Sequence, residues 1–517
     1  MAIKDHIPHV QAMEETPEHA VSTINVNRWW RYRNLRSLNL WMMVPLLSIF
    51  SQGFDGSMMN GLQSVSHWQS YFGTPKGATL GLFNAAYPLG GVVGVFLISP
   101  VADRWGRRVG ICTGALVACV GAAIQGGALN IAMFIVSRLF IGAGSVIVAG
   151  VGAPYITEIA HPEQRSTATA LFLTFYSVGS ITAAFCTFGT FRINGEASWR
   201  IPSALQALPS VIQVLLIWFV PESPRWLVDK SRHEEALAML IKFHGEDNPS
   251  DPVVVFEYNE IISAIETERA DAQSSLLGTL RELVSGTGNR RRTMIMVWAA
   301  VCSQMSGNAF VSYYLSPILT SVELEKDVQQ TLINATSQMV SWFSAIYFAT
   351  LPAKLGRRTM FLCSLVAMWF IVIAITAGSA EFAKDRSNKA AGYAVVVLLY
   401  LFSPAYNFGF NGNLGLYIPE ILPYYLRTKG ISFFYFVQYC FMILSTFAVP
   451  IGLENIQWRL YIIFVGWIVV EFVGVWFLFP ETKGPSLEEI AIIFDGPSQA
   501  KNIDSNDVEA KQVEAKN

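Results

Sequence analysis

The chain has 517 residues, of which 52% are hydrophobic and only 14% are charged, and its formal net charge is −2. A soluble domain carries about 25% charged residues to keep its surface in water, so this composition excludes an ordinary soluble protein and predicts a chain that lipid covers. No basic stretch with interleaved aromatic residues accompanies the small net charge, and we therefore expect no nucleic acid among its partners.

Residues 1–39 precede the first long apolar run. They begin with a polar stretch that lacks the hydrophobic segment of a signal peptide. We therefore predict that residues 1–39 form a tail that stays in the cytosol.

Long apolar runs follow this tail. Because a bilayer core is about 30 Å thick, a helix needs roughly 20 apolar residues to cross it. Six such runs precede a polar central stretch and six follow it, near 40–60, 80–101, 109–129, 131–154, 168–190, 202–220, 294–318, 331–351, 359–377, 391–418, 430–451 and 459–479. The sequence therefore predicts an all-α membrane protein with twelve transmembrane helices in two six-helix halves, 40–220 and 293–479.

Residues 221–292 carry most of the ordinary soluble composition of the chain. This stretch opens with PESPRW at 221–226 and closes with three arginines at 290–292. Apolar residues at helical spacing in 234–243 and 255–269 predict short helices under the bundle rather than a catalytic domain. We interpret 221–292 as a loop between the halves and 480–517 as a C-terminal tail.

Lysine and arginine are concentrated in alternate short loops. They precede the first span, follow the second, fourth, eighth and tenth spans, and lie at both edges of the central loop. Short cytosolic loops carry an excess of these residues, and twelve crossings put all these segments on one side. We therefore predict a multi-pass protein, in the plasma membrane, whose tails and central loop are cytosolic.

Three short motifs recur in the two halves. DRWGRR at 103–108 is matched by LGRR at 355–358, Glu158 and Arg165 by Glu420 and Arg427, and PES at 221–223 by PET at 480–482, each roughly 250–260 residues apart. Paired motifs at one separation indicate a duplicated chain with parallel halves. Transporters built in this way hold their substrate between the halves, near the middle of the membrane.

These motifs, together with PETKG at 480–484, resemble the signature set of the sugar porter family of the major facilitator superfamily. SQMSGN at 303–308, VSYYL at 311–315 and FDGSMMNG at 54–61 are similar to its fungal lactose, cellodextrin and hexose permease branch. The resemblance implies a major facilitator fold and a secondary active transporter. Such a transporter moves a mono- or disaccharide by alternating access, here with proton symport.

Charge inside or at the end of an apolar span is informative, because its burial is expensive and usually functional. Asp55 is in the first span and Arg138 is in the fourth. The resemblance implies that they face each other as a proton-coupling pair, because a nearby arginine favours the ionised carboxylate and its withdrawal favours protonation. The alternative is that Asp55 caps a helix end at the outer surface, with Gly53 and Gly56 marking a break.

A sugar site needs amides for paired hydrogen bonds and aromatic rings for stacking. The seventh and tenth spans supply such residues, and we predict that the substrate is bound by Gln304, Asn308, Tyr313, Tyr314, Asn411 and Asn413. The alternative is that some of these amides only form hydrogen bonds between helices.

The repeated charged motifs lie at the cytosolic ends of the spans, where opposed charges can hold helix ends together. We predict a gating role for Asp103, Arg104, Arg107, Arg108, Glu158, Arg165, Glu222 and Arg225 in the first half and for Gly356, Arg357, Arg358, Glu420 and Arg427 in the second. The alternative is that the basic residues only set the topology.

The sequence contains no nucleotide-binding loop, metal-ligand set or Ser/His/Asp arrangement, so we expect neither an enzyme nor a cofactor or metal. We expect a monomer in the lipid bilayer whose partners are a sugar and a proton. Two other functions stay open: a receptor that senses sugar, and a transporter of a non-sugar polyol, acid or secondary metabolite.

Overall fold

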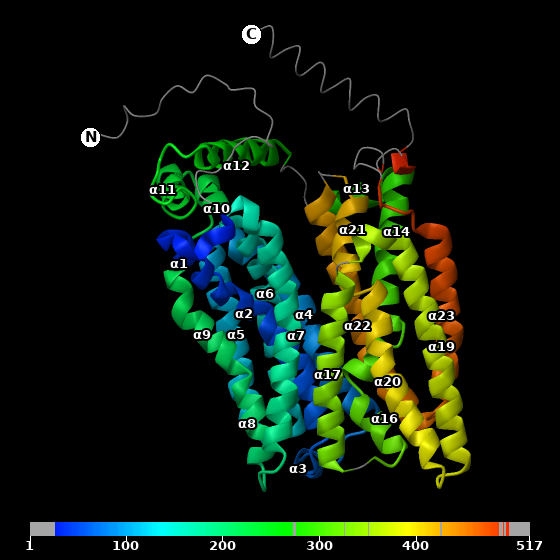
Figure 1. Cartoon of the computed structure of the whole chain (residues 1–517). Coiled ribbons are helices and arrows are strands. Elements are labelled where there is room, and N and C mark those ends of the chain that lie inside the picture. The colour runs from blue at the N-terminus through cyan, green and yellow to red at the C-terminus, as the bar shows by residue number, and fades with distance from the viewer. Residues whose placement is uncertain are drawn as a thin grey trace.

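The computed structural model describes residues 26–271, 276–324, 326–349, 351–423, 426–484, 490 and 493–495. Every regular element in these ranges is a helix. Two bundles of long helices stand side by side, and α10, α11 and α12 lie across one end of the first bundle (Figure 1). The twelve predicted crossings are present, and the chain has the major facilitator fold.

The first half contains six crossings. They are α2 (Met43–Leu62), α4 (Gly77–Trp105), α5 (Arg107–Gly126), α6 (Ile131–Ile159), α7 (Arg165–Thr190), and the pair α8 (Ala197–Leu205) and α9 (Ala207–Leu216). Shorter helices accompany them: η2 (Val26–Arg31), α1 (Arg33–Trp41), α3 (Ser66–Tyr71), η3 (Pro162–Gln164) and η4 (Ile217–Phe219).

The second half repeats this arrangement with two broken helices. The seventh crossing is divided into α14 (Gly286–Met305), α15 (Asn308–Ser312) and α16 (Leu315–Ser321), and the tenth into α20 (Lys389–Gly409) and α21 (Asn413–Ile421). The other crossings are α17 (Asp327–Ala349), α19 (Arg357–Lys384), α22 (Arg427–Asn455) and α23 (Arg459–Leu478), with α18 (Pro352–Leu355) before α19.

Nine helical segments of the described chain are long and apolar enough to cross a membrane by length and composition alone. The crossings that begin with α2, α14 and α17 fall outside this group. Their sequences are interrupted by polar residues that the bundle buries, such as Asp55 in α2, Ser303 in α14 and Asn334 in α17. A helix that faces protein instead of lipid can carry such groups, so the less hydrophobic crossings identify the interior of the molecule.

The halves meet along two helix pairs, α4 with α22 and α7 with α17. Phe96 and Phe436 pack with ring centroids 5.8 Å apart. Nearer the opposite end, a Cβ added to Gly81 would lie 2.9 Å from the carbonyl oxygen of Phe447. Small residues therefore let α4 and α22 approach closely, as is common where helices associate in a membrane.

Hydrogen bonds also join the halves at the end opposite α10–α12. The Asn60 side chain donates to the carbonyl of Val311 (2.7 Å) and accepts from the amide of Leu315 (3.2 Å). Gln63 donates to the carbonyl of Tyr313 (2.9 Å). These backbone groups lie where the seventh crossing is broken, so they lack helical partners. The amides of α2 thus satisfy the break and close this end of the molecule.

The central loop contains α10 (Pro224–Asp229), α11 (His233–Phe243), α12 (Pro252–Asp271) and α13 (Leu276–Val284). A buried polar cluster attaches α11 and α12 to the first half. The Glu257 carboxylate contacts the His244 ring at 2.6 Å and also pairs with Arg165, and the other ring nitrogen of His244 lies 3.2 Å from the carbonyl of Ile159. His161 packs against His244 with ring centroids 5.3 Å apart.

This cluster gives the attachment of the loop a pH dependence. Burial, together with the neighbouring His244, lowers the pKa of His161 to about 4. Burial alone would raise the pKa of Glu257, but His244 and Arg165 lower it below its usual range. A released loop would expose His161 with an ordinary pKa of about 6.5. The released state therefore binds more protons between these values, and acid favours it.

We expect α11 and α12 to detach progressively as the pH falls from about 6.5 towards 4. Hydrogen exchange of purified protein in lipid nanodiscs should show less amide protection of these helices at about pH 5 than at pH 7, after correction for the intrinsic rate. His161→Phe should weaken this change. His233→Gln, at an exposed histidine of α11, is the matched control and should keep it. Equal protection of wild-type α11 at both pH values would contradict the prediction.

Candidate functional site

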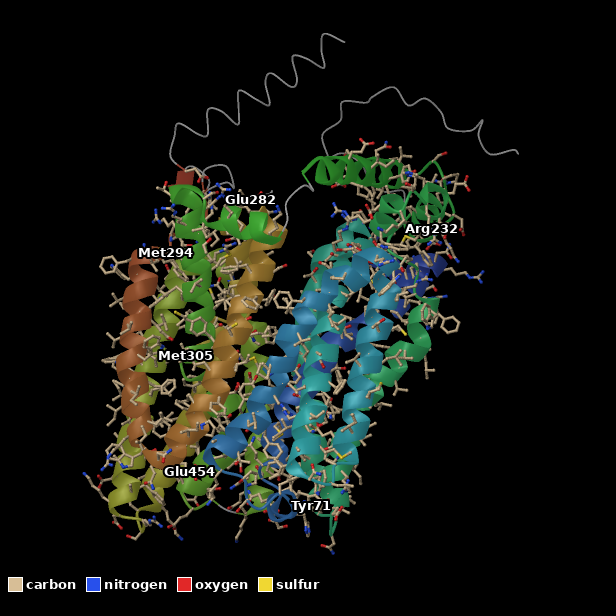
Figure 2. The ribbon with its side chains drawn as sticks, turned by 180° about the vertical axis from the view of Figure 1, so that it is seen from behind. Tyr71, Arg232, Glu282, Met294, Met305 and Glu454 are labelled. Carbon is tan, nitrogen blue, oxygen red and sulfur yellow. The ribbon has the colours of Figure 1, made fainter. Side chains whose placement is uncertain are left out.

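A cavity of about 190 Å³ lies between the two halves. Its lining includes Gln304, which precedes Met305, the last residue of α14. In Figure 2, Met305 lies between Glu282 near one end of the bundle and Glu454 near the other. Polar and aromatic side chains from both halves line the cavity: Gln52, Asp55, Tyr87 and Tyr176 from the first, and Gln304, Asn308, Ser312, Tyr313, Gln438 and Tyr439 from the second, with Gly56 and Met442.

Asp55 and Arg138 form a two-pronged ion pair at this cavity. The guanidinium nitrogens of Arg138 lie 3.2 and 3.3 Å from the two carboxylate oxygens of Asp55. The Asp55 side chain is 2% exposed and the Arg138 side chain is 1% exposed. A buried pair of this kind offsets the loss of hydration that either charge alone would suffer. The predicted partners are therefore together, and Asp55 lies inside α2 instead of at a helix end.

Glycines bring the helices of this pair close to their neighbours. A Cβ on Gly53 would lie 1.8 Å from the carbonyl oxygen of Tyr176, and one on Gly142 would lie 2.0 Å from that of Tyr87. Only glycine allows backbones to approach so closely. α2 runs through Gly53 and Gly56 without a break, so these glycines serve packing.

The break in the seventh crossing places three predicted substrate residues at the cavity. Gly307 adopts a φ of +99°, a conformation that glycine tolerates best, and separates α14 from α15. Gln304 donates to the hydroxyl of Ser303 at 3.3 Å, and Asn308 accepts from the hydroxyl of Ser312 at 3.0 Å. Both amides, together with Tyr313, line the cavity.

Three other predicted substrate residues lie elsewhere. Tyr314 is buried and donates to the carbonyl of Thr446. Asn411 donates to Asn407 at 3.2 Å, and Asn413 donates to the carbonyl of Arg357 at 3.1 Å. None of the three lines the cavity. In the tenth crossing the helix ends at Gly409 and resumes at Asn413, so that the Asn413 amide bonds to the start of α19 while Asn411 bonds back to α20.

Sequence reasoning missed several residues of the cavity. Gln52 and Gln438 are amides inside apolar spans, the same signal that identified Gln304, and Gln438 donates to the Ser303 hydroxyl at 3.1 Å. Tyr87, Tyr176 and Tyr439 gave no comparable signal. The chain has 18 tyrosines, and a tyrosine in an apolar span most often packs in the interior.

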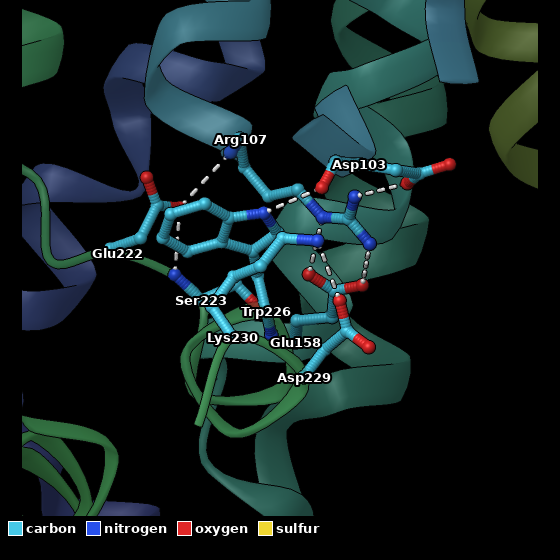
Figure 3. Close-up of polar contacts among 8 residues, drawn as sticks. All are labelled: Asp103, Arg107, Glu158, Glu222, Ser223, Trp226, Asp229 and Lys230. Atoms are coloured by element: carbon cyan, nitrogen blue, oxygen red, sulfur yellow. Dashed lines mark hydrogen bonds and ion pairs between the residues drawn. The ribbon is translucent and has the colours of Figure 1, made fainter. Parts of the chain in front are cut away.

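The charged residues at the loop end of the first half form one network (Figure 3). Arg107 contacts both carboxylate oxygens of Glu158 (3.1 and 3.0 Å) and one of Asp103 (2.9 Å). Glu222 accepts from the backbone amides of Arg107 (3.1 Å) and Arg108 (3.4 Å). A carboxylate at a helix N-terminus accepts hydrogen bonds from the free backbone amides and interacts favourably with the positive end of the helix dipole. The network ties α4, α5 and α6 to the start of the loop.

The second half repeats this network with its own residues. Glu481 accepts from the amides of Arg357 (2.7 Å) and Arg358 (3.1 Å), and Arg357 pairs with Glu420 at 2.7 Å. Gly356 has a φ of +88°, and its counterpart Gly106 has a φ of +102°. A Cβ on either would lie within 2.7 Å of the corresponding glutamate oxygen. Each ion pair named here stays within one half.

The remaining predicted gating residues are distributed around these networks. Arg165 pairs with Glu257 of α12, not with Glu158. Arg358 donates to the carbonyl of Trp476 at 2.6 Å, and Arg104 is exposed, with its guanidinium over the Trp105 ring. Arg225 lies in α10 and Arg427 begins α22.

Comparisons with known proteins agree along nearly the whole chain. The sequence profile described as "Sugar (and other) transporter" matches residues 41–494. The chain is 26% identical to the MFS-type transporter criB of Aspergillus cristatus, over 87% of this chain and 91% of that protein. It is 27% identical to the high-affinity glucose transporter 1 of Candida albicans, over 86% and 83%. The partially occluded inward-open xylose transporter XylE from E. coli has a TM-score of 0.71 at 18% identity, over 88% and 99%.

The glycine at the start of α5 allows a sharp test of the first network. We expect Gly106→Ala to lower the free energy of unfolding by about 1–3 kcal/mol, because the new methyl group is strained at positive φ and collides with Glu222. Thermal unfolding of the purified protein measures this loss. Gly189→Ala is the control, because Gly189 lies in α7 with nothing within 4 Å of an added Cβ. Equal stability of Gly106→Ala and wild type would contradict the role given to this glycine.

Proposed function

The chain belongs to the sugar (and other) transporter family, and from this premise we propose that it carries a sugar together with a proton across the plasma membrane by alternating access. The observation that carries this proposal is the cavity between the halves. It places the Asp55–Arg138 pair beside the amides of Gln304 and Asn308. A proton site and a substrate site that share one cavity can respond to the same movement of the halves.

The lining of the cavity suits a small polyhydroxylated ligand. Each amide can donate and accept, so it can bind adjacent hydroxyls, and the tyrosine rings offer faces for the apolar side of a pyranose. The cavity volume of about 190 Å³ is below the ~300–1,000 Å³ of sites for drug-sized ligands. This size favours a monosaccharide over a disaccharide.

Coupling follows from the position of Asp55 between the cavity and Arg138. While the pair is intact, the positive charge of Arg138 stabilises the carboxylate. When α2 and α6 shift against each other within the first half during the cycle, Arg138 withdraws, and the buried carboxylate takes a proton from the side that is then open. Substrate and proton therefore cross together.

The closed end of the molecule identifies the state of the cycle. Asn60 and Gln63 join α2 to α15 and α16 at the end opposite the central loop, and the ribbons of the halves diverge towards the loop end (Figure 1). With the tails and the loop in the cytosol, as the basic loops favour, this arrangement corresponds to an inward-facing state. The charged networks then join helix ends at the loop side within each half.

A second candidate is the transport of an aromatic or polyol-like metabolite. It is favoured by the four tyrosines at the cavity, Tyr87, Tyr176, Tyr313 and Tyr439, which could stack on a flat ring as well as on a sugar. The experiment that separates the candidates is uptake of a labelled sugar panel in a host without its own sugar transporters, with and without a protonophore. Protonophore-sensitive accumulation of a sugar supports the proposal. Sugar-dependent signalling without uptake would instead support a receptor.

The amides at the break of the seventh crossing should determine affinity. We expect Gln304→Ala and Asn308→Ala each to raise the apparent KM about fivefold, because each loses a hydrogen bond of about 1 kcal/mol. Initial rates over a range of substrate concentrations measure this. Asn411→Ala is the matched control, since Asn411 lies outside the cavity, and its KM should not change. Unchanged KM in both cavity variants would mean that these amides serve only packing.

Asp55→Asn should separate transport from energy coupling. The variant keeps a neutral side chain that can neither take up nor release a proton. We expect accumulation against a gradient to vanish while exchange of internal for external substrate survives, since the loaded carrier still resembles the protonated form. Arg138→Ala should also abolish accumulation. Asp385→Asn, at an exposed loop residue, is the control. Protonophore-sensitive accumulation by Asp55→Asn would exclude Asp55 as the coupling site.

A further inference from the structure

A second carboxyl group is buried in the bundle, on α23 of the second half. Glu471 is 0% exposed. The indole nitrogen of Trp467 donates to its Oε1 at 2.8 Å, whereas its Oε2 has no hydrogen-bond partner among the described residues. The backbone carbonyl of Glu471 accepts from the indole of Trp298 on α14 at 3.3 Å. A single glutamate in a lipid-crossing helix is expensive and calls for a functional explanation.

No cation accompanies Glu471 within the part of the chain that the structure describes. A charge on Glu471 would act on the thiol of Cys302 on α14 and on the phenol of Tyr406 on α20, and neither of these groups is a cation. α19 also packs against α23, but its charged residues are near its two ends: Arg357, Arg358, Glu381 and Lys384. Glu471 therefore differs from Asp55, whose charge is paired with Arg138.

A carboxylate in this environment has lost its hydration and gained one neutral hydrogen bond, so the neutral acid is the form that the site favours. The oxygen without a partner is the atom at which a proton can be held. We propose that Glu471 binds a proton in this conformation and is a second proton site of the carrier, located in the second half behind the substrate cavity.

The position of Glu471 connects this proton to the cavity. Cys302 is followed by Ser303, whose hydroxyl accepts from both Gln304 and Gln438 and whose carbonyl accepts from Tyr406 at 2.9 Å. Glu471 thus lies behind the turn of α14 that presents Gln304. A charge on Glu471 would need water or a cation at this surface, and either would displace that turn. The proton on Glu471 and its contact with α14 are independent of the proposed function, and only their effect on transport rests on it.

Infrared difference spectroscopy of the purified full chain in lipid nanodiscs tests the proposal without any substrate. At neutral pH we expect a carbonyl band of a protonated carboxylic acid that is lost in Glu471→Gln and retained in Asp55→Asn. Glu381→Gln, at an exposed glutamate on α19, is the matched control and should leave the band unchanged. The same band in wild type and Glu471→Gln would overturn the proposal, whether or not the chain transports sugar.

Hydrogen exchange supplies the second readout. At alkaline pH, where Glu471 loses its proton, amides of 298–305 should exchange faster in wild type than in Glu471→Gln measured at the same pH. Glu471→Asp keeps a titratable carboxyl and should retain the alkaline increase. If Glu471→Gln does not fold, Glu471→Asp still tests the proposal, because its acid band should shift in frequency. Equal exchange in wild type and Glu471→Gln at every pH would overturn the link to α14.

Discussion

The fold depends on one constraint: inside the hydrocarbon there is no water, so each backbone and side-chain polar group needs a partner within the protein. Unbroken helices meet this requirement alone. The seventh crossing is broken between Met305 and Asn308 and again between Ser312 and Leu315. The second break is tolerated because Asn60 and Gln63 of the other half supply the missing hydrogen bonds. The divided crossing that exposes Gln304 and Asn308 to the cavity at one break therefore makes one half depend on the other at its second break.

Free backbone amides are also given hydrogen-bond partners at the loop end of each half. Glu222 and Glu481 sit at the N-termini of α5 and α19 and accept from the first free amides of those helices. Gly106 and Gly356 leave room for the carboxylates. The two networks share this geometry although their ion pairs differ. Arg107 contacts two carboxylates, whereas Arg357 pairs with Glu420 alone among the carboxylates that the structure describes. The geometry is thus determined by the helix terminus rather than by the number of ion pairs.

The sequence predicts the fold well because hydrophobic length and charged loops report directly on membrane crossings. It also predicts Asp55 and Arg138, since charge in an apolar span has few explanations. It predicts the cavity less well. Asn413 lies beyond a helix break that changes the direction of its amide, and a linear pattern does not record such a break. Glu471 is a lone acid in the last span that sequence reasoning passed over, and its isolation from cations emerges only from packing.

The seal formed by Asn60 and Gln63 has a consequence for how the carrier moves. Its hydrogen bonds join neutral amides to backbone groups, while the ion pairs at the loop end lie within single halves. Mobile ions screen charged contacts but hardly affect neutral ones. The hydrogen bonds of Asn60 and Gln63 therefore keep their strength when the ionic strength changes, unlike the exposed hydrogen bonds that the Asp327 carboxylate accepts from Ser66 across the same end.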